Sequence, residues 1–433
     1  MTNGSNRFRF RNCMNWRFNS RRPLAVAAIL CGFIGVESVG ANQPASGPAM
    51  RRDGAAADCN DAGVSADGRF VVFVSNADNL VAGDHNGLSD VFVRDRTLGR
   101  TTLVSVNSSG TASGNGASRA GTISADGRFV AFESLASDLV ANDTNGVSDI
   151  FLRDLVAGTT MLVSVSGDGI TPGNGPSSWP VMTPDGHFVL FESRASNLDT
   201  NDANNAADLF VRDMSSGITT LVTRDRFSNA SALGGDFFFS DAARISDDGR
   251  WVAFASAATN LVAFDNNSKR DVFLRDLLNR TNILVSVNTN KVAASGISGI
   301  PALSADGRFV AFQSLASDLA AKDNNATNDV FLRDVALGTT TLVSVSLTGA
   351  SGKGSSFGPV ISADGRYVGF QSLASDLVAN DSSSDPNIQP LDVFVRDLQT
   401  GVTTMISEHS TQTILDASYY TNWTGPGGEA RAL

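Results

Sequence analysis

Acidic and amide side chains recur at one fixed spacing in this sequence, in the pattern D-x-N-x-x-x-D. Five segments carry the pattern in full: Asp84, Asn86 and Asp90; Asp143, Asn145 and Asp149; Asp202, Asn204 and Asp208; Asp265, Asn267 and Asp271; and Asp323, Asn325 and Asp329. Carboxylate and amide oxygens at alternate places along a turn are typical ligands of Ca²⁺, which takes about six to eight oxygens. One segment would supply about four of them, counting a backbone carbonyl. These residues are therefore candidate metal ligands, and Ca²⁺ is the one cofactor that the sequence suggests.

The same residues also fit a purely structural interpretation. Asp and Asn are common in tight turns because their side chains bond to their own backbone, and repetition would copy such a turn without any ion. An Asp or Asn five residues before each segment, such as Asn79 or Asp138, could complete a metal shell. A sixth segment departs from the pattern, with Ser383 in the Asn position and an insertion before Asp392. Weak calcium sites and plain turns both stay open, and no site is expected in the sixth segment.

Other residues that could do chemistry are few. The chain has three His and three Cys. His85, His187 and His409 do not stand at a motif spacing from any nucleophile. We therefore predict no catalytic residue and no site for an organic cofactor.

The elements that must position the acidic segments are copies of one repeated unit. The string S-A-D-G-R-F, or a close variant, starts at Ser65, Ser124, Thr183, Ser246, Ser304 and Ser362. Each copy is typical of four short strands, with a tight Asp-Gly turn between the first two and the acidic loop between the second and third. A single four-stranded sheet cannot bury both of its faces. The sequence therefore predicts an all-β fold, a six-bladed β-propeller with four antiparallel strands per blade, over residues 61–407.

Two further features recur in every copy. Most of the 26 Phe fall at three repeated positions, which in the second copy are Phe129, Phe132 and Phe151. Rings at strand spacing are usually core, so we expect them between blades rather than exposed to a ligand. The third strand ends in Arg-Asp, for example Arg153-Asp154. Adjacent strand residues face opposite ways, so this Arg is expected to pair with the Asp of a neighbouring blade.

The run S-x-D-G-R-[FY]-V-x-F-x-S resembles the propeller repeats of the TolB type, which are related to WD-like blades. The resemblance spans about six copies of the unit and implies blades around a central channel. It also implies little about function, because such propellers serve as periplasmic binding scaffolds and as accessory domains of peptidases and lyases. The G-x-S-x-G motif of the peptidase relatives is absent.

Three functional hypotheses follow. The first is a non-catalytic binding scaffold that meets a protein or a glycan at one propeller face, with Ca²⁺ in its acidic loops. The alternative is a lyase or hydrolase working in the central channel, for which no convergent set of residues is visible. A third is a surface module that stiffens an envelope assembly. We expect a monomer, and the net charge of −11 excludes a nucleic-acid partner because nothing would neutralise phosphates.

The N-terminal segment predicts export. Six Arg and no acid precede a short apolar run in residues 1–41, as in a secretory signal peptide, so no membrane span is expected after its removal. Residues 42–60 are expected to be a flexible lead-in and residues 408–433 a C-terminal tail. The mature protein would be periplasmic or secreted, and with Cys59 as its only Cys it would form no internal disulfide.

Overall fold

The computed structural model describes residues 59–204, 206–227, 230–232, 243–379 and 391–407, together with Ala55 and Asp381. The expected signal peptide, most of the lead-in and the C-terminal tail lie outside these described residues. No helix in the described part of the chain is long and apolar enough to cross a bilayer.

The described residues form six sheets of four strands each. The first three sheets comprise β1 (Cys59–Val64), β2 (Phe70–Ser75), β3 (Asp90–Asp95) and β4 (Arg100–Leu103); β5 (Ser118–Ile123), β6 (Phe129–Ser134), β7 (Asp149–Asp154) and β8 (Thr159–Leu162); and β9 (Ser177–Met182), β10 (Phe188–Ser193), β11 (Asp208–Asp213) and β12 (Ile218–Leu221). The last three comprise β13 (Arg244–Ile245), β14 (Trp251–Ser256), β15 (Asp271–Asp276) and β16 (Thr281–Leu284); β17 (Ser298–Leu303), β18 (Phe309–Ser314), β19 (Asp329–Asp334) and β20 (Thr339–Leu342); and β21 (Ser356–Ile361), β22 (Tyr367–Ser372), β23 (Asp392–Asp397) and β24 (Val402–Met405).

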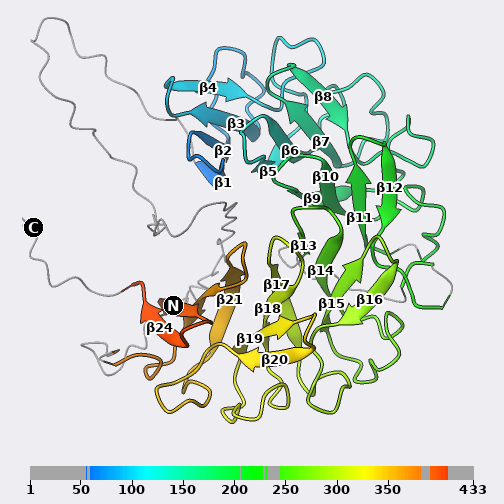
Figure 1. Ribbon diagram of the computed structural model, residues 1–433. Helices are drawn as coiled ribbons and strands as arrows, with labels where there is room; N and C mark the ends of the chain where they lie inside the picture. Colours follow the sequence, from blue (N-terminus) through cyan, green and yellow to red (C-terminus); the bar gives the residue numbers. More distant parts are fainter. Residues whose placement is uncertain are drawn as a thin grey trace, which may run out of the picture.

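Every sheet is an antiparallel meander of strands that are consecutive in the chain. The sheets follow one another around a common axis, with the first strand of each nearest the axis and the fourth at the rim (Figure 1). This arrangement confirms the prediction of an all-β, six-bladed propeller with four antiparallel strands per blade. No strand is exchanged between the first and last sheets in the described residues.

The S-A-D-G string forms the tight turn between the first and second strands. In the second blade the Ser124 hydroxyl donates to Asp126 Oδ1 at 2.6 Å and accepts the amide of Phe129 at 2.9 Å. Asp126 Oδ1 also accepts the amide of Arg128 at 2.9 Å. Gly127 has a φ of +76°, which suits glycine in such a turn. The local sequence therefore specifies the turn that starts each blade.

Backbone hydrogen bonds link these turns near the axis. The amide of Ala66 donates to the carbonyl of Ala125, and the amide of Ala125 donates to the carbonyl of Pro184. The same link runs from Asp247 to Ala305 and from Ala305 to Ala363. Since proline has no N–H, the series is interrupted after Pro184. These bonds hold neighbouring blades in register at their inner ends.

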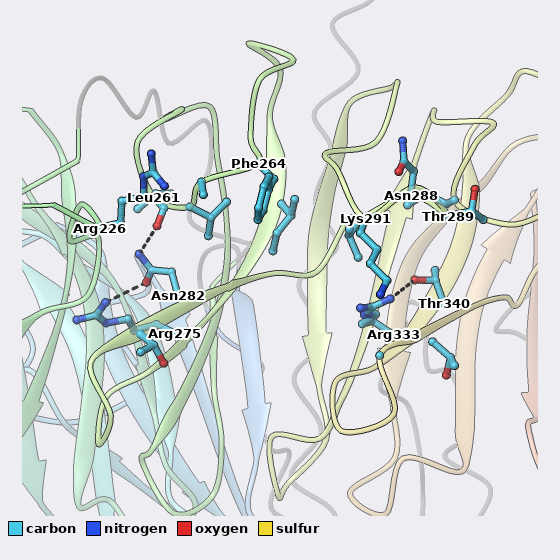
Figure 2. Close-up of a pocket in the computed structure, with 18 of the residues that line it drawn as sticks. Arg226, Leu261, Phe264, Arg275, Asn282, Asn288, Thr289, Lys291, Arg333 and Thr340 are labelled. Atoms are coloured by element: carbon cyan, nitrogen blue, oxygen red, sulfur yellow. Dashed lines mark hydrogen bonds between the residues drawn. The ribbon is translucent and has the colours of Figure 1, made fainter.

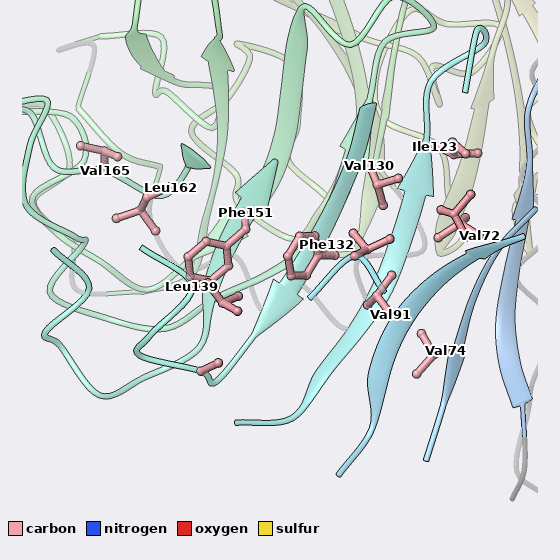
Figure 3. Close-up of a cluster of buried hydrophobic side chains, with 13 residues drawn as sticks. Val72, Val74, Val91, Ile123, Val130, Phe132, Leu139, Phe151, Leu162 and Val165 are labelled. Carbon is pink, nitrogen blue, oxygen red and sulfur yellow. The ribbon is translucent and has the colours of Figure 1, made fainter. Parts of the chain in front are cut away.

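Phenylalanine pairs form the core between blades. The sequence predicted buried rings at three repeated positions, and nearly all of those at two of them are fully buried. Phe132 and Phe151 are fully buried, and their ring centroids lie 5.7 Å apart. They pack against the valines of the preceding sheet, among them Val72, Val74 and Val91 (Figure 3). Equivalent clusters join each later pair of consecutive sheets.

The third repeated aromatic position behaves differently. Phe129 is only partly buried, and the guanidinium of Arg128 lies 4.7 Å from its ring centroid. Its ring packs across the blade boundary against Gly186 of the next turn, where a Cβ would lie 2.6 Å from the ring. The corresponding ring in the last blade, Tyr367, has no such contact with Gly68 of the first blade. The first and last sheets are therefore not packed together in the way that consecutive sheets are.

Candidate functional site

The D-x-N-x-x-x-D segments lie in the loops between the second and third strands. Their final Asp is the first residue of the third strand, as in β7, which starts at Asp149. Each loop is followed by two rim strands and a connector that returns to the axis (Figure 1). The same side chains thus occupy the same place in successive blades.

In the first, second and fourth blades the Asn of the segment donates a hydrogen bond to the final Asp, and the two side chains form a structural unit. In the second blade Asn145 Nδ2 donates to Asp149 Oδ2 at 2.6 Å and to the carbonyl of Gly173 at 2.9 Å. Asn145 Oδ1 accepts the amide of Val147 at 3.0 Å, which is the turn expected from the structural interpretation. The Ser164 hydroxyl, at the end of the fourth strand, donates to Asp149 Oδ1. These bonds fasten the loop to the rim and to the following connector.

The first Asp of each segment is different, because it is buried with an oxygen that accepts no hydrogen bond. Asp143 is 5% exposed, and its Oδ1 has no partner. The same holds for one or both oxygens of four equivalent buried residues, which are Asp84, Asp202, Asp265 and Asp323, and for one oxygen of Asp381, which is itself only partly buried. Burying a carboxylate without a partner is costly, so a cation or a proton is needed to compensate.

Burial also changes the acidity of these groups. It raises the pKa of Asp143, and it raises the pKa of Asp149 to about 7, to which the nearby charge of Asp143 adds. The equivalent final Asp residues are shifted in the same direction by burial: Asp90 to a pKa of about 6, and Asp208, Asp271 and Asp329 to about 7. Each loop therefore holds two acidic groups whose ionised forms are disfavoured unless positive charge is supplied.

In the third and fifth blades the oxygens without a hydrogen bond come from both acids of the segment, whereas in the first and fourth blades both belong to the first Asp. The final Asp residues of the third and fifth blades, Asp208 and Asp329, each keep one buried oxygen without a hydrogen bond, in addition to the oxygens of Asp202 and Asp323. In the described residues no three His, Cys, Asp or Glu side chains cluster as a metal group. Any cation in these loops would rely on two carboxylates, backbone carbonyls and water.

The Asp or Asn five residues before the segment bonds to a connector instead of joining these oxygens in the second and third blades. Asp138 Oδ1 accepts the amide of Asn115 at 2.9 Å, and Asn197 Oδ1 accepts the amide of Asn174 at 2.9 Å. These side chains hold the connector that precedes their own blade. The sequence suggested that these side chains could complete a metal shell, but here their Oδ1 atoms accept hydrogen bonds from the backbone.

The Arg-Asp pairs differ from the expectation. Asp154 is paired within its own blade by Arg128 of the Asp-Gly-Arg turn, with Nη2 to Oδ2 at 2.7 Å and Nε to Oδ1 at 3.2 Å. Arg153 instead donates to the Thr160 hydroxyl at 2.9 Å. The prediction of ion pairs between neighbouring blades is wrong, because the hairpin between the second and third strands places Asp154 opposite Phe129, next to Arg128. His187 replaces this Arg in the third blade and lies 3.6 Å from Asp213.

These ion pairs predict a loss of stability in acid. The hydrogen bonds from Arg69, Arg128 and Arg250 lower the pKa values of Asp95, Asp154 and Asp276 to about 2, from 3.8. A lowered pKa in the folded state stabilises the fold above the unfolded value, and this contribution disappears as pH falls through the folded value. We expect the free energy of unfolding, measured with urea, to fall between about pH 4 and pH 2.

The same pairs offer a matched test of that prediction. Arg250→Gln removes the partner of Asp276 and should make the fall between pH 4 and pH 2 shallower. Arg100→Gln, at an exposed position outside these pairs, should leave the pH profile unchanged. Identical slopes for the Arg250 variant and the native chain would contradict the assignment.

A pocket of about 1020 Å³, which the sequence did not predict, lies between the fourth and fifth sheets. It is formed among β15, β16, β19 and β20, with Arg275 and Asn282 on one wall and Lys291 and Arg333 on the other (Figure 2). One signal could have indicated it. Asn282 stands where the other five copies have Thr, so the fourth copy breaks the repeat at this wall.

Comparisons with known proteins found similar solved structures at low sequence identity. No family model and no curated protein matches the chain. Among solved structures, TolB from Acinetobacter baumannii is similar at 18% identity and a TM-score of 0.37, over 73% of this chain and 58% of that one. Oligogalacturonate lyase from Vibrio parahaemolyticus is similar at 13% identity and a TM-score of 0.44, over 80% and 77% of the two chains. Acylaminoacyl peptidase from Pyrococcus horikoshii is similar at 11% identity and a TM-score of 0.44, over 82% and 46%.

These similarities concern the fold alone. This chain spans only 58% of the Acinetobacter TolB and less than half of the peptidase. The class of the protein rests on its own six four-stranded sheets, which define a six-bladed β-propeller.

Proposed function

We propose that this protein is an exported, non-catalytic binding scaffold whose acidic loops bind Ca²⁺. The observation that carries the calcium proposal is the buried Asp at the start of the acidic loop in each of the first five blades, which has at least one oxygen without a hydrogen-bond partner. Asp202 with Asp208, and Asp323 with Asp329, are the pairs best placed to act as ligands. Asn and the hydrogen-bonded Asp of the other loops would act mainly as supports, since their oxygens already accept hydrogen bonds.

Calcium binding would explain why such loops persist around the ring. Ca²⁺ would neutralise the two acids that burial keeps unfavourable in their ionised forms. Because an ion that binds only the folded state stabilises it by mass action, even weak sites would add to stability at high Ca²⁺. The export that we infer from the basic N-terminal segment would suit the proposal, since extracellular modules work with weak sites. A partner, protein or glycan, would meet one propeller face, where loops from several blades are presented together.

We expect the melting temperature, measured by calorimetry at pH 7.5, to be several degrees higher in millimolar Ca²⁺ than in chelator. The test variant is Asp202→Asn combined with Asp323→Asn. Without Ca²⁺ the double variant should be as stable as the native chain or more stable, because it removes buried unpaired charge. With Ca²⁺ it should gain less than the native chain.

The control is Asp78→Asn, which removes an exposed negative charge near the first acidic loop. It should keep the full response to Ca²⁺. If the native chain melts at the same temperature in Ca²⁺ and in chelator, the calcium proposal is wrong and the loops are structural turns. Mg²⁺ at the same concentration should have a smaller effect, because Mg²⁺ demands near-ideal octahedral geometry.

One observation favours the alternative, a lyase or hydrolase that acts in the central channel. Glu133 and Glu192 occupy equivalent positions in neighbouring blades, where other copies have Val74, Ala255 or Gln313. Burial raises the pKa of Glu192, and the nearby charge of Glu133 adds to this. A partly buried acid with a raised pKa, such as Glu192, is a candidate proton donor. Turnover of oligogalacturonate or of a peptide ester that is lost in Glu192→Gln would favour the enzyme over the scaffold.

A further inference from the structure

The pocket between the fourth and fifth sheets concentrates positive charge on an acidic protein. Its ionisable wall residues are Arg226, Arg275, Arg280, Lys291 and Arg333, against a single acid, Asp225. The chain as a whole carries a net charge of −11. None of the five basic residues makes a salt bridge with another described residue. Among the described residues, the pocket therefore holds five cationic groups that make no direct ion pair.

Two of these arginines, one buried and one partly buried, have an Nε–H group that donates no hydrogen bond. Arg275 is 2% exposed and Arg333 is partly buried, and the Nε of each has no hydrogen-bond partner. Burial lowers the pKa of Arg275 to about 10. The same donor is unpaired in Arg153 and Arg212, so it recurs in the repeat, and only the fourth blade adds a second arginine, Arg280, in place of the glycine that follows the third strand. Buried donors without acceptors are rare in folded proteins and call for a partner.

Arg275 is also held in place by a residue specific to this blade. Asn282 Oδ1 accepts from Arg275 Nη1 at 3.1 Å, while Asn282 Nδ2 donates to the carbonyls of Arg224 at 2.8 Å and Leu261 at 3.1 Å (Figure 2). The Thr of other copies accepts from its Arg through a hydroxyl instead, as Thr340 does from Arg333. The Asn thus fixes the guanidinium against two neighbouring loops.

The backbone at two wall positions is unfavourable, and both positions carry a positive charge. Arg280 has a φ of +57°, and Lys291 has a φ of +64°. At the place of Arg280 the other five copies have glycine with positive φ: Gly99, Gly158, Gly217, Gly338 and Gly401. At the place of Lys291 three other copies also have a glycine with positive φ: Gly110, Gly169 and Gly349. A long side chain in this conformation is strained, and such strain is concentrated at functional sites.

We propose that this pocket binds a ligand that carries at least two oxyanion groups, whether carboxylate, sulfate or phosphate. Arg275 and Arg280 would hold one group, and Lys291 and Arg333 would hold the other across the pocket. Phe264, which is 65% exposed, offers a ring between these walls against which the ligand can pack (Figure 2). The volume suits a ligand larger than a single ion. Phe264 directly precedes Asp265 of an acidic loop, but no carboxylate of the acidic segments lines the pocket, and the proposal does not depend on calcium binding.

Titration calorimetry with the full chain tests the proposal, using pyrophosphate and a digalacturonate as probes and a neutral disaccharide as control. We expect saturable binding of at least one anionic probe, which weakens as salt is added, and none of the neutral sugar. Binding of pyrophosphate alone would assign phosphate chemistry, and binding of digalacturonate alone would assign carboxylate chemistry. Failure of both anions to bind would overturn the proposal.

Restoring the glycine of the repeat separates binding from folding. Arg280→Gly and Lys291→Gly each remove a charge and relieve the positive φ, so each should melt at the native temperature or above. We expect each to weaken binding at least about tenfold, since charge-assisted hydrogen bonds are strong. Arg100→Gln, an exposed rim residue of the first blade, should bind as the native chain does. Undiminished binding by both glycine variants would place the anion elsewhere and refute the site.

Discussion

Replacing Phe151 by alanine is expected to lower the free energy of unfolding by about 3–5 kcal/mol. Phe151 is fully buried, stacks on Phe132 and lies in the cluster that joins the first two sheets. Alanine would leave a cavity there, because two sheets fixed by hydrogen bonds at their inner ends cannot close around it. The measurement is unfolding in denaturant, followed by circular dichroism.

The control is Phe227→Ala, since Phe227 is 73% exposed. Its loss should change stability by about 0.5 kcal/mol or less. Phe331→Ala, at the equivalent buried place between the fourth and fifth sheets, should match Phe151→Ala. A small effect at both buried positions would contradict the packing of the blades on one another.

The second large effect is expected from Gly307→Ala. Gly307 lies in the Asp-Gly turn of the fifth blade with a φ of +75°, and a Cβ there would lie 2.2 Å from Trp251 of the fourth blade. Alanine therefore adds backbone strain of about 1–2 kcal/mol to an overpacking cost of about 1–3 kcal/mol. We expect a total loss of about 2–5 kcal/mol in the free energy of unfolding.

Gly87→Ala provides the matched control, because Gly87 has a φ of +66° but a Cβ at this position would meet no other atom within 4 Å. It should lose only the strain contribution. The difference between the two variants then measures the contact between blades. Equal losses at Gly307 and Gly87 would show that the ring of Trp251 does not constrain the turn.

Much of the fold could be predicted from the sequence, because the repeat makes local signals consistent. Ser124, Asp126 and Gly127 specify a turn by their own hydrogen bonds and backbone freedom, and six copies define the unit. The alternation of apolar residues then predicts the strands. The buried pairs such as Phe132 and Phe151 follow, because the two positions recur at strand spacing in every copy.

The ion pairs and the pocket could not be predicted in the same way. The partner of Asp154 depends on the register of a hairpin whose loop is long, and the sequence shows the loop but not the register. The pocket depends on how the fourth blade packs on the fifth, which brings Lys291 to Arg333. The sequence shows that Arg280 and Lys291 replace glycine. That these residues have a strained backbone follows only from their positive φ values in the structure.

Each sheet is completed by neighbouring segments of the chain, and no strand ties the last blade to the first in the described residues. Unequal recombination within the gene could therefore add or delete one whole unit without breaking any sheet. An inserted unit would bring its own turn, its own aromatic pair and its own acidic loop. A lineage of such proteins should vary in blade number, while substitutions that break the repeat, such as Arg280 and Asn282 in the fourth copy, stay confined to single units.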